Sequence, residues 1–384
     1  MNRKESNIIG IDAINIRRGG GVTHLVELLN NTNQNQHSFN KLVIWGPSST
    51  LRKIDDKPWI KKINPLQAEK NLVIRTIWQI FKLSAEVKKE GCSILFVPGG
   101  SYAGTYLPVV TMSQNLLPFE INELKRFGFS FMTLKLLMLR FTQSYTFSRS
   151  NGVIFLTEYA RKKIKNIVKK KEFKTKIIPH GLDIRFRSSP KIQKNIISYD
   201  NLNPYKILYV SIIDQYKHQW HVVNAVNILR KEGYPICLDL VGPSYSPALR
   251  RLNSTIEKVD PLGQWVSYQN EIPFNELHKS YANADLGLFA SSCENMPNIL
   301  LEMMASGLPI VSSDRGPMPD ILLDGGLYFD PEDPKNIASA IRKTITSEKL
   351  REDLAHRNYL NAQKFSWQTC SYRTFSFIDN IIIS

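Results

Sequence analysis

Cysteine is scarce in this sequence of 384 residues, which contains only four. The four are widely spaced, and they form neither a Cys-x-x-Cys pair nor a cluster with histidine. The pattern therefore predicts neither a disulfide framework nor a zinc site, and it favours a reducing compartment such as the cytosol. No Asp-x-Asp pair is present either, which agrees with a site that works without a metal ion or other cofactor.

Long apolar runs are also missing. Residues 1–12 begin with basic side chains and contain only a short apolar run before Asp12, which is typical of a first strand and not of a signal peptide. The longest apolar region, residues 127–141, is interrupted by Lys135 and Arg140 and is too short to span a bilayer. We therefore expect a cytoplasmic protein that is soluble or bound peripherally to a membrane.

Acidic residues are sparse in the N-terminal half. Residues 1–200 hold 33 basic and 14 acidic side chains, a net charge of +19, whereas the remainder carries −3. The basic charge concentrates in residues 124–141, a helical pattern of Phe, Leu and Met with interleaved Lys and Arg, and in the lysine-rich residues 159–176. Basic amphipathic helices are typical of membrane-surface elements. The alternative is that the first segment is a core-facing helix and the second a solvated face.

Nucleic acid is the other anionic partner to consider. No zinc finger, RNP-type strand or bZIP pattern is present, so the sequence does not indicate a nucleic-acid-binding protein. An anionic membrane surface is the partner that we expect for the basic N-terminal half.

Strand-like and helix-like stretches alternate in two cycles, which predicts parallel sheets with helices on both faces. In the first cycle we expect strands at residues 8–12, 42–46, 94–98, 108–112, 153–157 and 176–179, and helices at 22–31, 72–89, 122–141 and 158–170. In the second cycle we expect strands at 206–211, 237–242, 266–268, 285–290, 309–313 and 327–329, and helices at 219–231, 245–259, 274–282 and 297–306.

A polar, proline-bearing stretch separates the two cycles. It predicts an N-terminal domain over residues 1–184, a linker over 185–205, a C-terminal domain over 206–365, and a terminal helix over 366–384 that can return to the N-terminal domain. The fold class is α/β, with two domains whose parallel sheets face each other across a cleft. Open parallel sheets bind ligands beyond the carboxyl ends of their strands, so functional residues are expected in those loops.

Two glutamates stand where a predicted strand leads into a predicted helix, in residues 291–309 (SSCENMPNILLEMMASGLP). Glu294 lies in the loop before the helix, and Glu302 lies inside the helix, which ends before Gly307 and Pro309. The N-terminus of a helix offers free N–H groups and partial positive charge, which suit a phosphate. A carboxylate on either side can accept hydrogen bonds from sugar hydroxyls. This combination is what a nucleotide-sugar site requires.

A glycine-rich loop follows the first predicted strand. Gly20 and Gly21 lie there, just before a predicted helix, and glycine allows backbone N–H groups to approach a phosphate closely. The loop lacks the spacing of a dinucleotide fingerprint, which argues against an NAD enzyme.

The motifs together resemble the family-4 (group 1) retaining glycosyltransferases, which have the GT-B fold of two Rossmann-like domains. The resemblance rests on residues 294–311 with the following ILLDGGLYFDPEDPKNIASAI, on residues 179–183 (PHGLD), on residues 207–217 (ILYVSIIDQYK) and on residues 7–22. These segments span most of the chain in the family's order. The C-terminal half is the closer match.

The resemblance implies roles for individual residues. Glu294 would bind hydroxyls of the transferred sugar, and Lys217 would neutralise the donor diphosphate. His180, at the domain junction, is a third catalytic candidate, and the alternative for it is a structural hydrogen-bonding role. Donor-binding positions would be Glu302 on the ribose, the glycine loop with Gly20 and Gly21, and the helix start at Met296, Pro297, Asn298 and Ile299. Asn115 stands in a loop where family members often carry a histidine, and it is a candidate for positioning the sugar or the acceptor.

One feature of the family is missing. An arginine usually precedes the lysine, and here Ile213 and Asp214 occupy the stretch. Lys217, with help from His218, would then carry more of the phosphate charge, or Arg17, Arg18 or Arg315 would substitute.

The resemblance implies a metal-independent enzyme that moves a sugar from a nucleotide diphosphate sugar to a glycan or lipid-linked acceptor, without a protein nucleophile. We expect it to act in bacterial lipopolysaccharide, O-antigen or capsule synthesis, peripherally on the inner face of the cell membrane. The alternatives are a GT-B-fold nucleotide-sugar epimerase, a phosphorylase, for which no pyridoxal lysine signature is present, and a non-catalytic membrane-associated scaffold. The base, sugar, acceptor and linkage stay open.

Overall fold

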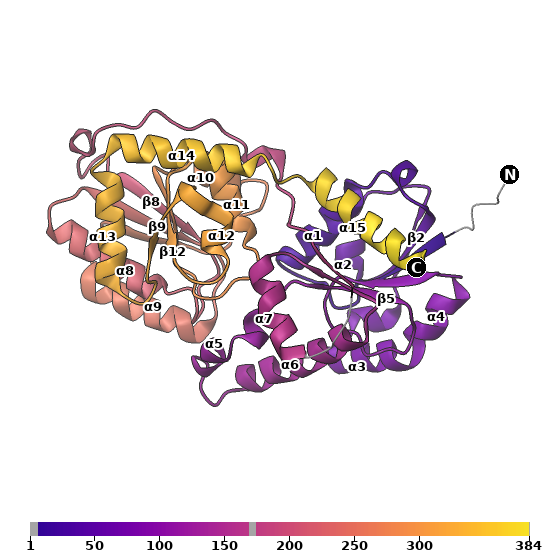
Figure 1. Ribbon diagram of the computed structural model, residues 1–384. Helices are drawn as coiled ribbons and strands as arrows, with labels where there is room; N and C mark the ends of the chain where they lie inside the picture. Colours follow the sequence, from indigo (N-terminus) through magenta and orange to yellow (C-terminus); the bar gives the residue numbers. More distant parts are fainter. Residues whose placement is uncertain (1–6, 169–173, 384) are drawn as a thin grey trace. The chain divides into compact units, whose positions relative to one another are not determined.

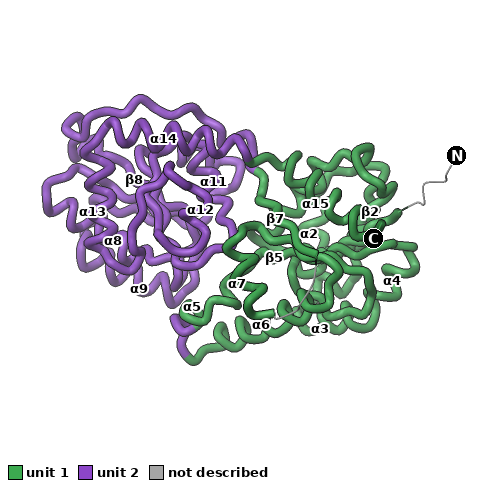
Figure 2. The backbone as a smooth tube through the Cα atoms, viewed as in Figure 1, with its two compact units in different colours: residues 1–124, 129–181, 365–384 green, residues 125–128, 182–364 purple. Residues whose placement is uncertain are grey.

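The computed structural model describes residues 7–168 and 174–383, and the chain divides into two compact units (Figure 2). The first unit comprises residues 1–124, 129–181 and 365–384, and the second comprises residues 125–128 and 182–364. Each unit is a parallel sheet covered by helices (Figure 1).

The sheet of the first unit has seven strands in the order β3-β2-β1-β4-β5-β6-β7. All neighbouring strands pair in parallel. Its strands are β1 (Asn7–Asp12), β2 (Phe39–Trp45), β3 (Ile60–Ile63), β4 (Ile94–Val97), β5 (Val109–Ser113), β6 (Gly152–Phe155) and β7 (Lys174–Ile177). Its principal helices are α1 (Gly20–Asn30), α3 (Leu72–Trp78), α4 (Ser84–Lys89), α6 (Phe131–Arg149), α7 (Glu158–Val168) and α15 (Trp367–Ile382).

The sheet of the second unit has six parallel strands in the order β10-β9-β8-β11-β12-β13. Its strands are β8 (Tyr205–Val210), β9 (Ile236–Val241), β10 (Val266–Gln269), β11 (Leu286–Phe289), β12 (Ile310–Ser313) and β13 (Gly326–Phe329). Its helices are α8 (Gln219–Lys231), α9 (Ser246–Val259), α10 (Leu277–Asn283), α11 (Asn298–Ala305), α12 (Met318–Leu322), α13 (Pro334–Ile345) and α14 (Glu348–Ala362).

Every strand predicted from the sequence is present, within a few residues at its ends, and the α/β class is confirmed. Strand β3 was not predicted, because it is a four-residue edge strand in which two residues are lysines. Helices α13 and α14 were not predicted either.

The helix expected over residues 122–141 is two helices. α5 (Ile121–Lys125) ends before Gly128, whose φ of 58° belongs to the left-handed region, and α6 begins at Phe131. The helix expected over 158–170 is described as far as Val168, and residues 169–173, which carry part of the predicted basic segment, lie outside the described residues.

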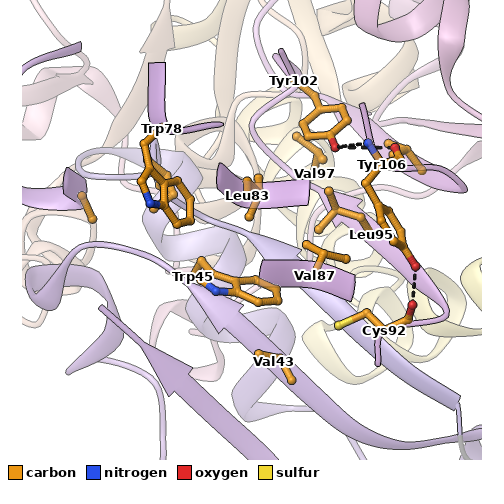
Figure 3. Close-up of a cluster of buried hydrophobic side chains, with 13 residues drawn as sticks. Val43, Trp45, Trp78, Leu83, Val87, Cys92, Leu95, Val97, Tyr102 and Tyr106 are labelled. Atoms are coloured by element: carbon orange, nitrogen blue, oxygen red, sulfur yellow. Dashed lines mark hydrogen bonds between the residues drawn. The ribbon is translucent and has the colours of Figure 1, made fainter. Parts of the chain in front are cut away.

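The core of the first unit packs two tryptophans and two tyrosines against the sheet (Figure 3). Trp45 comes from β2 and Trp78 from the end of α3, and Tyr102 and Tyr106 come from the loop between β4 and β5. The Tyr102 hydroxyl accepts a hydrogen bond from the Tyr106 backbone N–H at 2.9 Å, and the Tyr106 hydroxyl donates to the Cys92 carbonyl. The polar ends of both rings are therefore satisfied inside an apolar cluster, as buried tyrosines require.

Helix α15 is the final element of the chain and belongs to the first unit. Its Ser371 hydroxyl lies 2.8 Å from that of Thr32, and its Asp379 accepts a 2.6 Å hydrogen bond from Ser38. Its Arg373 donates to the Ile177 carbonyl at 2.8 Å. Residues from both ends of the sequence are thus needed to complete this unit.

The segment 185–205, expected as a linker, lies within the second unit. The Ser188 N–H donates to the Ala305 carbonyl at 2.9 Å, and the Lys191 ammonium donates to the Ala284 carbonyl at 2.8 Å. Arg351 of α14 is fully buried and donates to the Gln193 side chain and to the carbonyls of Lys194, Thr344 and Ile345. The arginine therefore ties the segment to α13 and α14.

Within residues 7–168 and 174–383, no helix is both long and apolar enough to cross a bilayer.

Arg351→Met should destabilise the second unit by about 3 kcal/mol, because several buried carbonyls would lose a charged donor. Arg357→Met is a matched control on the same helix, since Arg357 is half exposed and pairs only with Asp324. Urea unfolding followed by tryptophan fluorescence measures both variants. Equal midpoints for the two variants would show that the segment is not held by Arg351.

Candidate functional site in the second unit

Strands β8 and β11 are neighbours in the sheet of the second unit. From β8 the chain builds outward through β9 and β10, and it then crosses to β11 and builds the other half through β12 and β13. The boundary between β8 and β11 is therefore the topological switch point of the sheet, where ligands of open parallel sheets bind. The loops after these two strands contain Lys217 and Glu294.

The loop after β8 is held in shape by backbone contacts. The Lys217 N–H donates to the Asp214 carbonyl at 3.0 Å, and the Lys217 carbonyl accepts from the Tyr209 hydroxyl at 2.7 Å. The next residue, His218, has φ 55°, which is uncommon for a side-chain-bearing residue. The loop therefore turns sharply into α8 and leaves little freedom to the backbone of Lys217.

Two contacts join this loop to the loop after β11. The Ser292 N–H donates to the Tyr216 carbonyl at 2.8 Å, and the Ser292 hydroxyl lies 2.9 Å from His218 Nε2. The two loops of the switch point consequently form one connected surface.

Lys217 and Glu294 form an ion pair on this surface. The Lys217 ammonium donates to Glu294 Oε1, and the two side chains are 6% and 14% exposed. The ammonium also lies 5.1 Å from the ring centres of Tyr216 and Phe289. A lysine shielded from water in this way is stabilised by the glutamate and by the faces of two aromatic rings.

Helix α11 begins immediately after this loop. Pro297 precedes the helix in an extended conformation, and no side chain caps the first turn. Met296 and Pro297 are buried and Asn298 and Ile299 are half-buried. The side-chain oxygen of Asn298 is buried without a hydrogen-bond partner. The first turn of α11 therefore keeps donor groups and partial positive charge beside the Lys217–Glu294 pair.

Glu302 lies inside α11 and is buried. It accepts a 2.9 Å hydrogen bond from the Tyr281 hydroxyl. Burial raises the pKa of Glu302 to about 7, the hydrogen bond from Tyr281 opposes the shift, and the nearby Asp183 carboxylate adds to it. Asp183 itself is paired with Arg185 at 2.7 Å. The sequence pattern did not indicate that Tyr281 and Asp183 are neighbours of Glu302, although Asp183 is the last residue of the PHGLD segment.

His218 lies in positively charged surroundings that were not predicted. Burial and the nearby Arg126 lower the pKa of His218 to about 3. Arg126 is bonded to Glu332 at 2.6 and 2.9 Å, and the guanidinium of Arg251 lies 4.1 Å from the Trp220 ring centre. The imidazole of His218 is therefore neutral at pH 7 and adds no positive charge beside Lys217.

The arginines considered as substitutes are engaged with other groups or exposed. Arg315 donates to Asp330 at 3.0 Å and lies 3.2 Å from Asp314. Arg17, in the first unit, contacts the Ala68 carbonyl, and Arg18 is exposed.

The remaining predicted site residues belong to the first unit. His180 is buried, and its Nδ1 lies 2.8 Å from Nδ1 of His24, with the Trp367 ring packed against both imidazoles. Burial lowers the pKa of both histidines, that of His24 to about 4. His180 thus contributes to a neutral, aromatic cluster that joins α1 and α15 to the chain after β7.

Gly20 and Gly21 begin α1, after β1 of the first unit. A β-carbon on Gly21 would lie 3.2 Å from the side-chain oxygen of Gln114. Asn115 is exposed, and its side-chain oxygen accepts a hydrogen bond from the Leu117 N–H at 3.0 Å. The glycine loop and the Asn115 loop therefore approach each other within this unit.

In the described part of the chain, no group of three or more histidine, cysteine, aspartate or glutamate side chains is placed to hold a metal ion.

The raised pKa of Glu302 predicts a pH-dependent stability. The unfolded chain releases this proton near pH 4.5 and the folded chain near pH 7, so the contribution of Glu302 to stability is present below 4.5 and is lost as the pH rises through 7. Glu302→Gln, which cannot ionise, should therefore gain at most about 3 kcal/mol over the unsubstituted protein between pH 5 and pH 8. Urea unfolding across this range measures the gain. Glu276→Gln, at a half-exposed position, is the control. A stability gain of Glu302→Gln that does not change with pH would contradict the raised pKa of Glu302.

Comparisons with known proteins agree with this architecture. The solved sucrose-phosphate synthase of Thermosynechococcus elongatus superposes on the chain with a TM-score of 0.76 at 16% identity, covering 98% of this chain and 99% of that one. The Anabaena protein HepE, solved in complex with UDP, gives 0.70 at 15% identity, covering 97% and 100%. Both similarities show the fold, which is GT-B.

Curated relatives match parts of the chain. The O-antigen chain mannosyltransferase B of Escherichia coli is 30% identical over 112 residues, which cover 29% of this chain and 29% of that protein. The D-inositol 3-phosphate glycosyltransferase of Paenarthrobacter aurescens is 26% identical over 198 residues, which cover 50% and 48%. The chain thus spans half or less of the length of these relatives. The model of the family described as glycosyl transferases group 1 matches residues 192–360. The matched segment makes up most of the second unit and includes Lys217, Glu294 and Glu302.

Proposed function

We propose that the protein is a retaining glycosyltransferase that uses a nucleotide diphosphate sugar as donor. The observation that carries the proposal is the meeting of Lys217, Glu294 and the uncapped start of α11 at the switch point of the second unit. The match of residues 192–360 to the model of the glycosyl transferases group 1 family supports it. The finer assignment to the family-4 retaining enzymes is part of the proposal.

The donor diphosphate would lie against the first turn of α11. The free N–H groups of that turn and the Lys217 ammonium are the positive groups available there. An incoming phosphate competes with Glu294 for the ammonium, so binding would release the carboxylate of Glu294. The released carboxylate could then accept hydrogen bonds from hydroxyls of the transferred sugar. Glu302 would accept hydrogen bonds from the ribose, and Met296 to Ile299 would line the donor.

The reaction would proceed on one face of the sugar. The anomeric C–O bond to the diphosphate breaks, and its electron pair leaves with the phosphate oxygen. The acceptor hydroxyl forms the new C–O bond on the same face, and the departing phosphate takes the proton of that hydroxyl. The protein would accelerate the reaction by stabilising the negative charge on the phosphate with hydrogen-bond donors. The loss of one well-placed donor of this kind typically lowers the rate by about 10²–10³. We propose that no metal ion and no protein nucleophile takes part.

The acceptor would be a glycan or a lipid-linked glycan in bacterial lipopolysaccharide, O-antigen or capsule synthesis. The similarity of part of the chain to an O-antigen chain mannosyltransferase supports this choice. We propose that the enzyme works at the cytoplasmic face of the membrane, and that the first unit, with Asn115 and the glycine loop, contributes to acceptor or donor positioning.

Thermal-shift measurements with UDP, GDP and ADP test donor binding. We expect one nucleoside diphosphate to raise the melting temperature selectively, and its sugar derivatives to raise it further. Equal responses to all three, or none, would contradict a nucleotide-sugar enzyme and would favour the non-catalytic scaffold.

Glu294→Gln separates the two roles proposed for that residue. Without the carboxylate, Lys217 is free for the diphosphate, so calorimetry should give unchanged or tighter binding of the nucleoside diphosphate. Binding of the nucleotide sugar should weaken by about tenfold or more, because a charged hydrogen-bond acceptor for the sugar is lost. Equal losses for both ligands would contradict these roles.

Lys217→Met should weaken the binding of the nucleoside diphosphate, with or without its sugar. It is best tested together with Glu294→Gln, because removing one partner of a buried ion pair leaves an uncompensated charge. The double variant is compared with Glu294→Gln alone, and Lys279→Met, which changes an exposed lysine of α10, is the control. Diphosphate binding that is as tight in the double variant as in Glu294→Gln would exclude Lys217 from the phosphate site.

A further inference from the structure

Helix α6 has apolar side chains on two opposite faces. Leu136 and Phe147 are buried on the face toward the sheet, together with Gln143. The other face exposes a row of large apolar side chains at every third or fourth position, which we name the α6 row. Its members are Phe131, Leu134, Leu137, Met138, Phe141 and Tyr145, with exposed fractions of 81, 55, 49, 61, 74 and 47%. A contiguous apolar row of this kind marks an interaction surface, unlike single exposed leucines.

A second element of the first unit repeats the pattern. α3 and the π-helical turn that follows it (Gln79–Leu83) bury Trp78 and Leu83 in the core. They expose Val73, Ile77 and Phe81 at four-residue spacing. In Figure 1 both α3 and α6 lie along the lower border of the first unit. Hydrogen bonds from the Tyr102 loop to Thr146 of α6 and to Ser84 connect α6 to the start of α4, which directly follows the π-helical turn.

The charge of both elements has one sign. Neither α6 nor residues 72–83 contain an aspartate or a glutamate, whereas Lys135, Arg75 and Lys82 stand among the exposed apolar side chains. Phe129, just before α6, is fully exposed as well. An apolar surface with basic residues and no acidic ones complements a layer of apolar chains beneath anionic head groups.

The other basic helix is built differently. α7 buries its apolar residues Ala160 and Ile164, and Lys162 is exposed on the solvent side. Within its described residues, α7 matches the solvated-face alternative for this segment. α6 faces the core on one side, as its own alternative expects, and in addition exposes the α6 row on the other side.

We propose that the α6 row and the exposed residues of α3 form a docking surface that inserts into the interface of a bilayer containing anionic lipid. A second copy of the chain is the less suitable occupant, because a symmetric contact of this surface with itself would bring like charges together without any acidic partner. The proposal deepens the proposed function and rests on it in one respect: it names the surface through which the enzyme would reach a lipid-linked acceptor.

Vesicle sedimentation with the full chain tests the proposal. The probes are vesicles of equal parts phosphatidylglycerol and phosphatidylcholine, and vesicles of phosphatidylcholine alone. We expect binding to the anionic vesicles that weakens with salt, since attraction to a charged surface is screened over a Debye length. Leu134→Ser combined with Phe141→Ser should reduce this binding by about tenfold or more, because two apolar side chains no longer enter the interface.

The matched control is Ile192→Ser combined with Leu262→Ser, which removes two apolar side chains of the second unit that are more exposed, at 92 and 79%, than Leu134 and Phe141. The control should bind vesicles as the unsubstituted protein does. Equal binding by both double variants, absence of binding to anionic vesicles, or a dimer that Leu134→Ser with Phe141→Ser dissociates in the absence of lipid would overturn the proposal.

Donor binding distinguishes this proposal from the proposed function. Both double variants leave Lys217 and Glu294 unchanged, so the thermal shift with the selective nucleoside diphosphate should be retained. Lost vesicle binding with retained nucleotide binding is the expected result for the α6 variant. If the unsubstituted protein binds the nucleotide but no vesicles, the docking surface is refuted and the proposed function is not. If it binds vesicles but no nucleotide, the proposed glycosyltransferase function is refuted and the docking surface is not.

Discussion

The candidate site depends on how the chain crosses the sheet of the second unit. Strands β8 and β11 are far apart in the sequence, yet they are neighbours because the sheet grows outward from them in opposite directions. Parallel pairing places both carboxyl ends at the same edge, so the following loops must meet there. The contacts of Ser292 with Tyr216 and His218 join those loops, and the Lys217–Glu294 pair lies on the surface that results.

The ion pair explains how a lysine can be kept out of water until the proposed donor phosphate binds. Burying an unpaired ammonium costs several kcal/mol, and here Glu294 and two aromatic faces offset that cost. Because attraction to the glutamate and attraction to a phosphate are of the same kind, one can replace the other without rebuilding the loop. Because the imidazole of His218 is neutral, Lys217 is the cationic side chain of a loop that also contains Asp214. Glu302 differs from Glu294, because its carboxyl group is buried with a tyrosine and not with a cation.

Short sequence patterns predicted the buried strands and several helix boundaries, because these features depend on residues that are close together in the sequence. Apolar runs bounded by small polar residues located the buried strands, whereas β3, with its two lysines, has an edge position that the sequence does not reveal. The motif around Glu294 and Glu302 indicated the correct loop and helix because capping and stop residues are local signals. The pairing of Glu294 with Lys217, the burial of Glu302 against Tyr281 and the pairing of His180 with His24 depend on side chains 77, 21 and 156 residues apart. Those contacts arise from packing, and no spacing rule predicts them. The same holds for the exposure of the α6 row, since a helix with apolar residues all around it does not disclose which face the sheet covers.

The most direct measurement is an experimental structure of the protein with its selective nucleoside diphosphate bound. We expect the diphosphate oxygens to lie within about 3 Å of the Lys217 ammonium and of backbone N–H groups in the first turn of α11, with Glu294 released from the lysine. A diphosphate bound elsewhere in the chain, with the Lys217–Glu294 contact intact, would contradict this expectation.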